Sequence, residues 1–240
     1  MEGRLTKKER KEQKRLHIAN KMEEKPQKTK FIIIFLVCVL FLALSAFGIY
    51  TIKMSKNKRA SASVSFLPSG WVTGNTKSSV TVTEFGDFQC PACFTFETTM
   101  RRIRSEYGNK VKIVYKHFPL RQAHPNALPS AIAAEAAGKQ GKFWEFHDLL
   151  YDNQNIWAGL SDPNSEFIKY AEKLKLDTTM FKKELGNSKH KEAISAQEDE
   201  GIKIGVNATP TVYVNGMYMG VPSYEDLKKK IDDALAASKK

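Results

Sequence analysis

The sequence predicts an α/β fold with a mixed central sheet and an inserted helical block, preceded by one transmembrane helix. Three observations support this fold class: an uncharged stretch over residues 31–52, several short segments in which apolar and polar residues alternate, and the order of the elements. That order is strand, helix, strand, a run of helices, two strands and a last helix. Strands on either side of a helix imply a right-handed parallel crossover.

The uncharged stretch over residues 31–52 reads FIIIFLVCVLFLALSAFGIYTI. At about 1.5 Å per residue, a helix of this length spans roughly 33 Å, which is enough for one membrane crossing. Residues 1–30 form a basic tail with eleven Lys and Arg, whereas four follow the stretch closely. The positive-inside rule therefore places the tail in the cytoplasm and the rest of the chain outside the cell membrane.

A cleaved signal peptide is the alternative, because Ala43-Leu44-Ser45 is a weak cleavage-like site. Signal peptides have an apolar core of about 7–15 residues and a short charged head, and both are longer here. We therefore expect an uncleaved single-pass anchor. A lipoprotein is not expected, because Cys38 lies in the middle of the span, and we interpret it as a buried apolar residue.

The net charge of +12 suggests nucleic acid at first, but the charge is unevenly distributed. Residues 1–60 hold 15 Lys and Arg against 5 Asp and Glu, whereas residues 61–240 hold 23 against 21. The folded part is therefore nearly neutral, and we expect no nucleic-acid partner. We expect a linker and lead-in over residues 53–76 and a domain over residues 77–240, long enough to bury a core.

The elements of this domain follow from its patterns. Residues 79–85 and 111–118 alternate as strands. Between them, one apolar helical stripe consists of Phe96, Met100, Ile103 and Tyr107. The helical block is expected over about residues 122–204, with helices at 131–137, 142–151, 165–176, 178–185 and 188–204.

The end of the domain returns to strands. Residues 211–214 and 217–219 read as two strands, and Asn215-Gly216 between them is a strong hairpin signal. This antiparallel pair makes the expected sheet mixed. Ser223-Tyr224-Glu225-Asp226 then begins a last helix as a capping box.

Cys90 and Cys93, which flank Pro91 and Ala92, form a pair that can close and open a small disulfide ring. Pro91 suits a first helical turn, so Cys90 should lie at a helix N-terminus, where the helix dipole lowers the pKa of a thiol. We expect Cys90 to be the exposed nucleophile and Cys93, one turn further in, to be the buried resolving thiol. Glu84, near the end of the preceding strand, is a candidate to exchange a proton with Cys93.

Other interpretations of the pair stay open. A zinc site needs four ligands, and the only other cysteine is Cys38 in the apolar stretch, so we expect no metal. A structural disulfide would close so little chain that it would add little stability. Glu84 can also be read as an ordinary carboxylate at a strand end. On the outer side of the membrane the cysteine pair would meet an oxidising environment.

Three segments together resemble the DsbA-like branch of the thioredoxin superfamily. They are residues 84–93, which end in the cysteine pair, residues 116–120, which read KHFPL, and residues 205–211, which read GVNATPT. The resemblance covers roughly residues 75–238 and implies a thioredoxin fold with a helical insertion.

The resemblance also implies roles for single residues. Pro210 would be a cis-proline beside the cysteine pair, and the backbone of Thr209 would pair with an extended substrate peptide. Glu84 matches the family's buried acid by position. From the sequence alone, a trans Pro210 at a strand start is the ordinary expectation. Ala92 and Thr209 depart from strongly oxidising DsbA proteins, which carry His and Val there, and they leave the direction of electron flow open.

We therefore expect a membrane-anchored thiol:disulfide oxidoreductase that forms disulfides in cysteine-containing exported proteins and needs no dissociable cofactor. The resemblance implies reoxidation by a membrane partner of the DsbB or VKOR kind. One alternative is a reductase or isomerase of the same fold. Isomerases dimerise through an added domain, and none is visible here, which favours the oxidase. The other alternative is a tethered peptide-binding module whose cysteines are only structural.

Overall fold

The computed structural model describes residues 7–61 and 63–238, and within its first helix it describes the side chains of residues 7–20 and 33–50. The chain divides into two units, Met1–Lys58 and Arg59–Lys240, and each is described here by itself.

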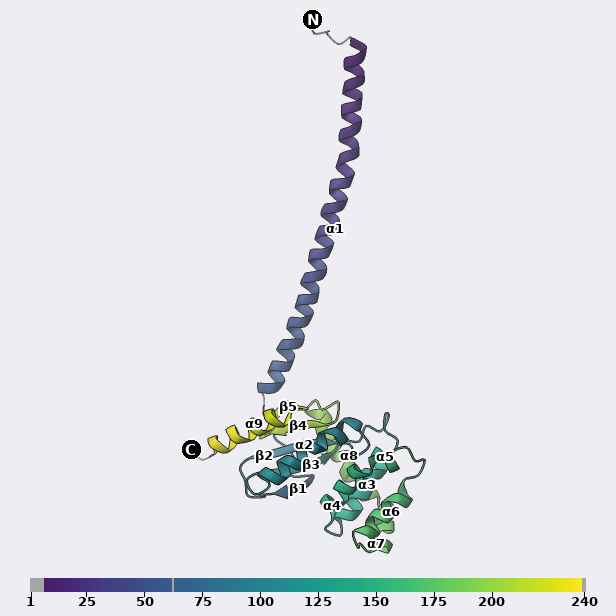
Figure 1. The fold of residues 1–240 in the computed structure, drawn as a ribbon, viewed down its shortest axis with the longest axis vertical. Helices are drawn as coiled ribbons and strands as arrows, with labels where there is room; N and C mark the ends of the chain where they lie inside the picture. Colours follow the sequence, from purple (N-terminus) through teal and green to yellow (C-terminus); the bar gives the residue numbers. More distant parts are fainter. Residues whose placement is uncertain (1–6, 62, 239–240) are drawn as a thin grey trace. The chain divides into compact units, whose positions relative to one another are not determined.

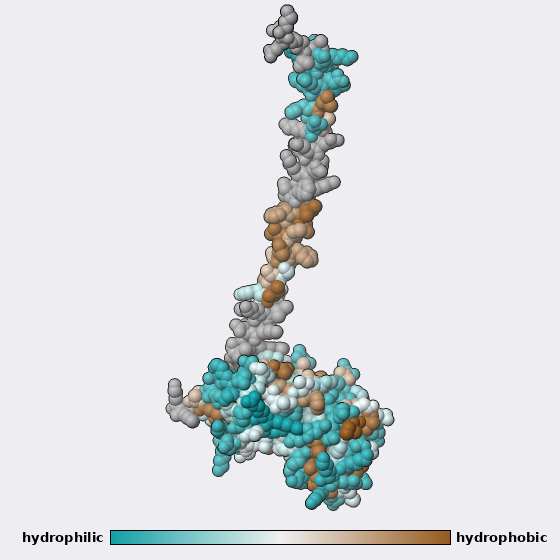
Figure 2. Space-filling model, viewed as in Figure 1, coloured by the Kyte–Doolittle hydropathy of each residue, from teal (hydrophilic) through white to brown (hydrophobic). Residues whose placement is uncertain are grey.

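The first unit is dominated by one helix, α1 (Lys7–Ser61). Its segment Ile33–Tyr50 is long and apolar enough to cross a membrane, by length and composition, and none of it is buried within the protein. Figure 2 shows this segment as a brown band along the helix. The helix also continues over residues 53–61, which were expected as linker. Those residues contain neither Gly nor Pro and are rich in Lys, which favours helix.

The second unit is built on one five-stranded sheet (Figure 1). Its strands are β1 (Trp71–Gly74), β2 (Thr81–Gly86), β3 (Lys112–His117), β4 (Thr211–Val214) and β5 (Met217–Gly220). They lie in the order β1-β3-β2-β4-β5. The pair β2–β3 is parallel and the other pairs are antiparallel, so the predicted mixed sheet is confirmed.

Strand β1 was not predicted as a strand. It is only four residues long, pairs Trp71 with Tyr115, and ends at Gly74, whose φ is +80°. The sequence signal was confined to Trp71 and Val72, which is too short to show a period of two. In the structure the Trp71 ring stacks on Phe143 with ring centroids 4.4 Å apart, so this strand joins the helical block to the sheet.

Helices α2 (Pro91–Tyr107) and α9 (Tyr224–Ala237) pack on one face of the sheet. The core between them includes the side chains of Val82, Ile113, Val212, Val214, Phe96, Ile103, Leu227 and Ile231. The predicted cap of α9 is present, because the Ser223 hydroxyl accepts a hydrogen bond from the Asp226 backbone N–H. The predicted hairpin is present too, with positive φ at Asn215 and Gly216 as a two-residue turn between β4 and β5 requires.

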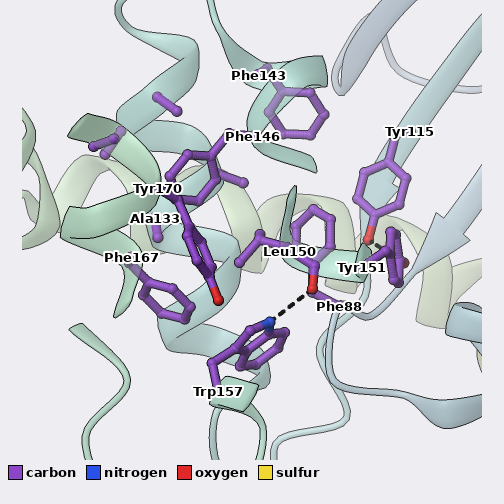
Figure 3. Close-up of a cluster of buried hydrophobic side chains, with 14 of the residues drawn as sticks. Phe88, Tyr115, Ala133, Phe143, Phe146, Leu150, Tyr151, Trp157, Phe167 and Tyr170 are labelled. Carbon is purple, nitrogen blue, oxygen red and sulfur yellow. Dashed lines mark hydrogen bonds between the residues drawn. The ribbon is translucent and has the colours of Figure 1, made fainter. Parts of the chain in front are cut away.

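The helical block lies between β3 and β4. Its helices are α3 (Ala127–Gly138), α4 (Phe143–Asp152), α5 (Gln154–Trp157), α6 (Asn164–Lys173), α7 (Thr178–Leu185) and α8 (Ser188–Lys203). They enclose an aromatic core around Phe146, Trp157 and Phe167 (Figure 3). Helix α5 was missed because a single turn carries no periodic pattern.

Candidate active site

Cys90 is the N-cap residue of α2, and Pro91 occupies the first helical turn, as the sequence predicted. The backbone of Cys90 is extended, with φ −69° and ψ 123°, and its N–H donates to the carbonyl oxygen of Asp87 at 3.1 Å. Both Cys90 and Cys93 are free thiols. The cysteine pair therefore lies at the N-terminus of a helix, where the first N–H groups lack partners within the helix.

Cys90 is less exposed than the sequence suggested, with only 6% of its surface accessible. The start of β4 covers it, because the Cys90 Sγ lies 3.4 Å from the carbonyl oxygen of Thr209. Cys93 is completely buried, as predicted. Cys90 is therefore nearly buried beside Thr209, and it is not the exposed thiol that the sequence predicted.

The pKa values of the two thiols are shifted in opposite directions. A hydrogen bond from Cys93 lowers the pKa of Cys90 to about 5, against the opposing effect of burial. Thr209 and the backbone N–H groups of Cys93 and Ala92 act in the same direction as Cys93. Burial raises the pKa of Cys93 well above its usual value, and the charges of Cys90 and Glu84 raise it further.

Glu84 lies in the middle of the sheet, on β2, and is 3% exposed. It pairs with Tyr115 of β3 on one side and with Val212 of β4 on the other. Because side chains alternate along a strand, it shares the face of Val82, which packs beneath α2. Burial raises the pKa of Glu84 to about 8; the charge of Glu97 raises it too, and Arg104 opposes them.

The peptide bond between Thr209 and Pro210 is cis, so the isomer implied by the family resemblance is present. It stands directly before β4 (Thr211–Val214). Thr209 is 7% exposed, and the contact of its carbonyl oxygen with Cys90 places the two predicted substrate-binding residues beside the cysteine pair.

Two glutamines that the sequence analysis missed hold this site in place. Gln154 of α5 donates from Nε2 to the carbonyl oxygens of Phe88, at 2.7 Å, and Cys90, at 3.1 Å. Gln89 donates from Nε2 to the carbonyl oxygen of Ala158 at 2.7 Å. Nothing in the local sequence distinguishes them from surface glutamines, because their partners are backbone atoms of distant residues.

Asp87 is a third residue that the sequence analysis left without a role. One carboxylate oxygen, Oδ1, accepts from the Gln89 backbone N–H at 2.8 Å. The other, Oδ2, bonds Leu120 N at 3.0 Å and His124 Nδ1 at 2.7 Å. Asp87 therefore fixes the turn between β2 and the cysteine pair.

Two tyrosines lie beside the pair. The hydroxyl groups of Tyr115 and Tyr151, both labelled in Figure 3, are 3.3 Å apart. Burial raises the pKa of both well above the ordinary value, and Cys93 and Glu84 add to this effect. Gly86 makes room for Tyr115, because a Cβ atom at Gly86 would lie 2.5 Å from the Tyr115 ring.

Exposed apolar side chains border the cysteine pair. Phe94 follows it on α2 and is 49% exposed. Ile156 and Leu160 are exposed at 51% and 39%, on the segment that Gln89 bonds through Ala158. Ala92, between the cysteines, is exposed as well. Exposed apolar side chains therefore lie on the segments that adjoin Cys90, whose sulfur is itself covered by Thr209.

The structure combines a thioredoxin-type sheet with two cysteines at a helix N-terminus. A cis-proline lies against the first cysteine and a buried acid lies beneath the second. These features define the class of thiol:disulfide oxidoreductases. The comparisons agree with this class. Residues 67–233 match a family model described as Thioredoxin. The chain is 38% identical over 172 residues to the probable disulfide bond formation protein D of Bacillus cereus, covering 68% of this chain and 77% of that protein.

Two further relatives complete the comparison. The oxidised crystal structure of BdbD from Bacillus subtilis superimposes with a TM-score of 0.64 at 26% identity, over 72% of this chain and 98% of that one. The Na(+)/H(+) antiporter NhaA 1 of Salinispora arenicola is 37% identical over 169 residues, which cover 70% of this chain but 25% of the antiporter. The chain thus spans about a quarter of the length of that relative. It belongs to the DsbA-like family of the thioredoxin superfamily.

Proposed function

We propose that the chain is a membrane-anchored thiol:disulfide oxidoreductase that introduces disulfides into cysteine-containing exported proteins. The observation that carries this proposal is the position of Cys90 at the N-terminus of α2, next to a buried Cys93 that lowers the pKa of Cys90 to about 5. A stable thiolate at Cys90 favours the reduced pair over the disulfide. The disulfide form is therefore a good oxidant and passes its bond to a substrate.

The reaction follows from the positions of the two sulfurs. A substrate thiolate attacks Cys90 Sγ, the Cys90–Cys93 bond breaks, and Cys93 leaves with the electron pair. Glu84, which is largely protonated at neutral pH, supplies the proton that Cys93 needs. A second substrate thiolate then attacks the substrate sulfur of the mixed disulfide, and Cys90 leaves as a thiolate. The substrate loses two electrons and the pair gains them.

Surfaces near the pair support an unfolded polypeptide as substrate. The backbone of Thr209, just before β4, would pair with an extended chain, as in β-augmentation. The exposed side chains of Phe94, Ile156 and Leu160 offer contacts for apolar segments, which unfolded proteins expose and folded proteins bury. The protein would then recognise its substrates by their backbone and apolar side chains and not by one particular sequence.

The membrane anchor and the recycling partner are part of the proposal. The apolar segment Ile33–Tyr50 supports anchoring, and the basic residues before it support a cytoplasmic N-terminus with the cysteine pair outside. Reoxidation by a DsbB- or VKOR-like membrane protein would return the pair to its disulfide form. Protease added to intact cells should digest residues 63–238 and leave the N-terminal tail protected; protection of both parts would contradict this topology.

A reductase or isomerase is the second candidate, because Ala92 and Thr209, which differ from the residues of strongly oxidising DsbA proteins, leave the direction of electron flow open. The equilibrium between the full chain in detergent and glutathione buffers decides between them. A potential near about −120 mV supports an oxidase, whereas one near about −270 mV supports a reductase. Replacing Cys90 with Ser tests the peptide-binding alternative: unchanged biological activity would exclude every redox function.

A further inference from the structure

Residues 154–160 of the helical block lie beside the cysteine pair, and we name this segment the α5 edge. It consists of α5 (Gln154–Trp157) and the three residues after it. Ile156 and Leu160 leave 51% and 39% of their surfaces exposed, whereas Trp157 is completely buried in the aromatic core of the block (Figure 3). The segment reads QNIWAGL and contains no charged residue. Its exposed side chains therefore offer apolar contacts without charge.

One end of the α5 edge is tied to the turn that holds the first cysteine. Gln154 is 9% exposed, and its Nε2 donates to the carbonyl oxygens of Phe88, at 2.7 Å, and Cys90, at 3.1 Å. The Cys90 carbonyl oxygen also accepts from the Phe94 N–H at 3.1 Å, as the carbonyl of an N-cap residue does at the start of a helix. Gln154 therefore fixes α5 against the start of α2.

The other end of the α5 edge is tied to the same turn by two further amides. Gln89 donates from Nε2 to the carbonyl oxygen of Ala158 at 2.7 Å, and its Oε1 accepts from the Asn126 N–H at 2.6 Å. Asn126, which is 4% exposed, donates from Nδ2 to the carbonyl oxygens of Leu160, at 2.7 Å, and Ala158, at 3.2 Å. Because Gln89 directly precedes Cys90, both ends of the edge are held against the cysteine turn.

The shortness of α5 explains why side chains make these bonds. The last carbonyl groups of a helix have no partner within it, and α5 has only four residues. A carbonyl group that is removed from water without a partner costs free energy, and the amides of Gln89 and Asn126 satisfy the carbonyl groups that follow α5. Side-chain amides therefore help to set the position of Ile156 relative to Cys90.

An extended substrate can reach the α5 edge from the reacting sulfur. Ile156 lies two residues after Gln154, whose amide is 3.1 Å from the Cys90 carbonyl oxygen. An extended chain advances about 3.3 Å per residue, so a polypeptide whose cysteine meets Cys90 brings a side chain to the edge within about four residues. Apolar side chains suit this uncharged surface, and unfolded polypeptides expose them.

We propose that Gln154 and Gln89 are positioning residues that hold the α5 edge beside Cys90. The edge then presents Ile156 and Leu160 as a docking surface for apolar side chains close to the substrate cysteine. The inference rests on the proposed function, because it assigns substrate selectivity at that same site. The two amides bond neither substrate nor sulfur, and they act by fixing a contact surface relative to the reacting atoms.

Two peptides measure this selectivity. Each carries a pair of cysteines, which leucines flank in one peptide and serines flank in the other. The oxidised full chain in detergent, with Cys38→Ala in every variant to remove the third thiol, is mixed with excess reduced peptide, quenched with acid, alkylated and analysed by mass spectrometry. The peptide thiols lose two electrons and two protons to form a disulfide, and the Cys90–Cys93 pair gains them, so no other oxidant is needed.

The dependence of the rate on peptide concentration gives a half-saturating concentration and a limiting rate. At low concentration, the leucine peptide should react about tenfold faster than the serine peptide, because its apolar side chains leave water at the edge. Gln154→Met keeps the size of the side chain but removes its donor. It should reduce this ratio to about two, by raising the half-saturating concentration of the leucine peptide. Gln89→Met should act in the same direction.

A double substitution tests whether the amide acts through the edge. Ile156→Ser removes an apolar contact at an exposed position and should also reduce the ratio of the two rates. Gln154→Met combined with Ile156→Ser should reduce the ratio no further than the stronger single substitution, because both act on one contact. Fully additive losses would mean that Gln154 acts independently of the edge, which would overturn its positioning role.

Gln140→Met is the matched control for the glutamines, because Gln140 bonds the backbone of a distant residue, Asp177, through both of its amide atoms. Ile202→Ser is the control for Ile156→Ser, because Ile202 is similarly exposed, at 58%, but lies on α8. Both controls should keep the native ratio.

An unchanged ratio in both Gln154→Met and Gln89→Met, or an equal loss in Gln140→Met, would overturn the positioning role and leave the proposed function intact. Equal slowing of the two peptides in Gln154→Met and Gln89→Met would overturn it as well, because the glutamines would then act on the cysteines and not on selection. Failure of the chain with its native glutamines to oxidise either peptide would overturn the proposed function itself.

Discussion

The sulfur of Cys90 lies 3.4 Å from the carbonyl oxygen of Thr209, 119 residues further along the chain. This contact brings the residues before β4 against the start of α2, in a sheet whose strands lie in the order β1-β3-β2-β4-β5. It places the backbone of Thr209 beside a reactive sulfur. A peptide that pairs with Thr209 therefore presents its own cysteine to Cys90.

The first prediction concerns the reactivity of Cys90. Because a hydrogen bond from Cys93 lowers the pKa of Cys90 to about 5, its alkylation by iodoacetamide should reach half of its maximal rate near pH 5. An ordinary thiol would reach it near pH 8.5. The measurement is the alkylation rate from pH 3 to pH 9, followed by mass spectrometry of the fragment that contains Cys90.

Cys93→Ala is the comparison for this profile. It removes the largest cause of the shift, so the midpoint of Cys90 should rise towards the ordinary thiol value while Thr209 and the helix N-terminus keep part of the effect. A midpoint near pH 8.5 in the native chain would contradict the description of Cys90 as a stabilised thiolate.

The second prediction concerns the buried acid. Because the folded pKa of Glu84 is raised to about 8, folding costs free energy as soon as the carboxyl ionises in the unfolded chain, above about pH 4.5. Glu84→Gln removes this cost. It should raise the free energy of unfolding at pH 7 by about 1–3 kcal/mol, and the gain should vanish below pH 4.

Urea unfolding of both forms at pH 4 and pH 7 measures this difference. In the same variant, the attack of Cys93 on a mixed disulfide at Cys90 should be slower, since the glutamine amide that replaces the Glu84 carboxylate cannot accept the proton of Cys93. If the substitution instead lowers the free energy of unfolding more at pH 7 than at pH 4, Glu84 is ionised in the folded protein.

The third prediction concerns Gly86. A Cβ atom there would lie 2.5 Å from the Tyr115 ring, which is buried and has no room to move. Gly86→Ala should therefore lower the free energy of unfolding by about 1–3 kcal/mol. Gly159→Ala is the matched control, because nothing lies within 4 Å of its added Cβ, and it should be neutral within about 0.5 kcal/mol. Equal effects of the two substitutions would contradict the packing of Tyr115 on Gly86.

The fourth prediction concerns the residue between the cysteines. Ala92 is exposed at the N-terminus of α2, so a larger side chain fits there. A partly protonated imidazole near the Cys90 sulfur would stabilise its thiolate further. Ala92→His should lower the pKa of Cys90 and make the potential in glutathione buffers more oxidising, whereas Ala92→Gln should change little. A more reducing potential in Ala92→His would contradict this electrostatic account.

Much of the fold could be predicted because its signals are local. The alternation in β2 and β3, the Asn215-Gly216 turn and the cap at Ser223 each depend on neighbouring residues, and the structure has all three. The fold class also followed, because the order of the elements restricts the topologies available. The segment expected as linker begins as helix, since α1 runs to Ser61 without a breaking residue.

Site residues could be predicted from the sequence only where they come from one continuous segment of the chain. Only two residues separate Cys90 from Cys93, so their positions on α2 followed from spacing. The contact with Thr209 needed the family resemblance, because no local pattern links the two segments. Gln154 and Glu97 were missed, since their partners come from other elements and their residue types are common on surfaces.

The most direct measurement is the transfer of a disulfide to a reduced, unfolded protein that needs disulfides to become active. One equivalent of the oxidised full chain should oxidise two substrate thiols and end with Cys90 and Cys93 reduced, and Cys90→Ser should transfer nothing. If instead the oxidised chain retains its disulfide while its reduced form cleaves disulfides of a folded protein, electrons flow in the opposite direction and the account of an oxidase is wrong.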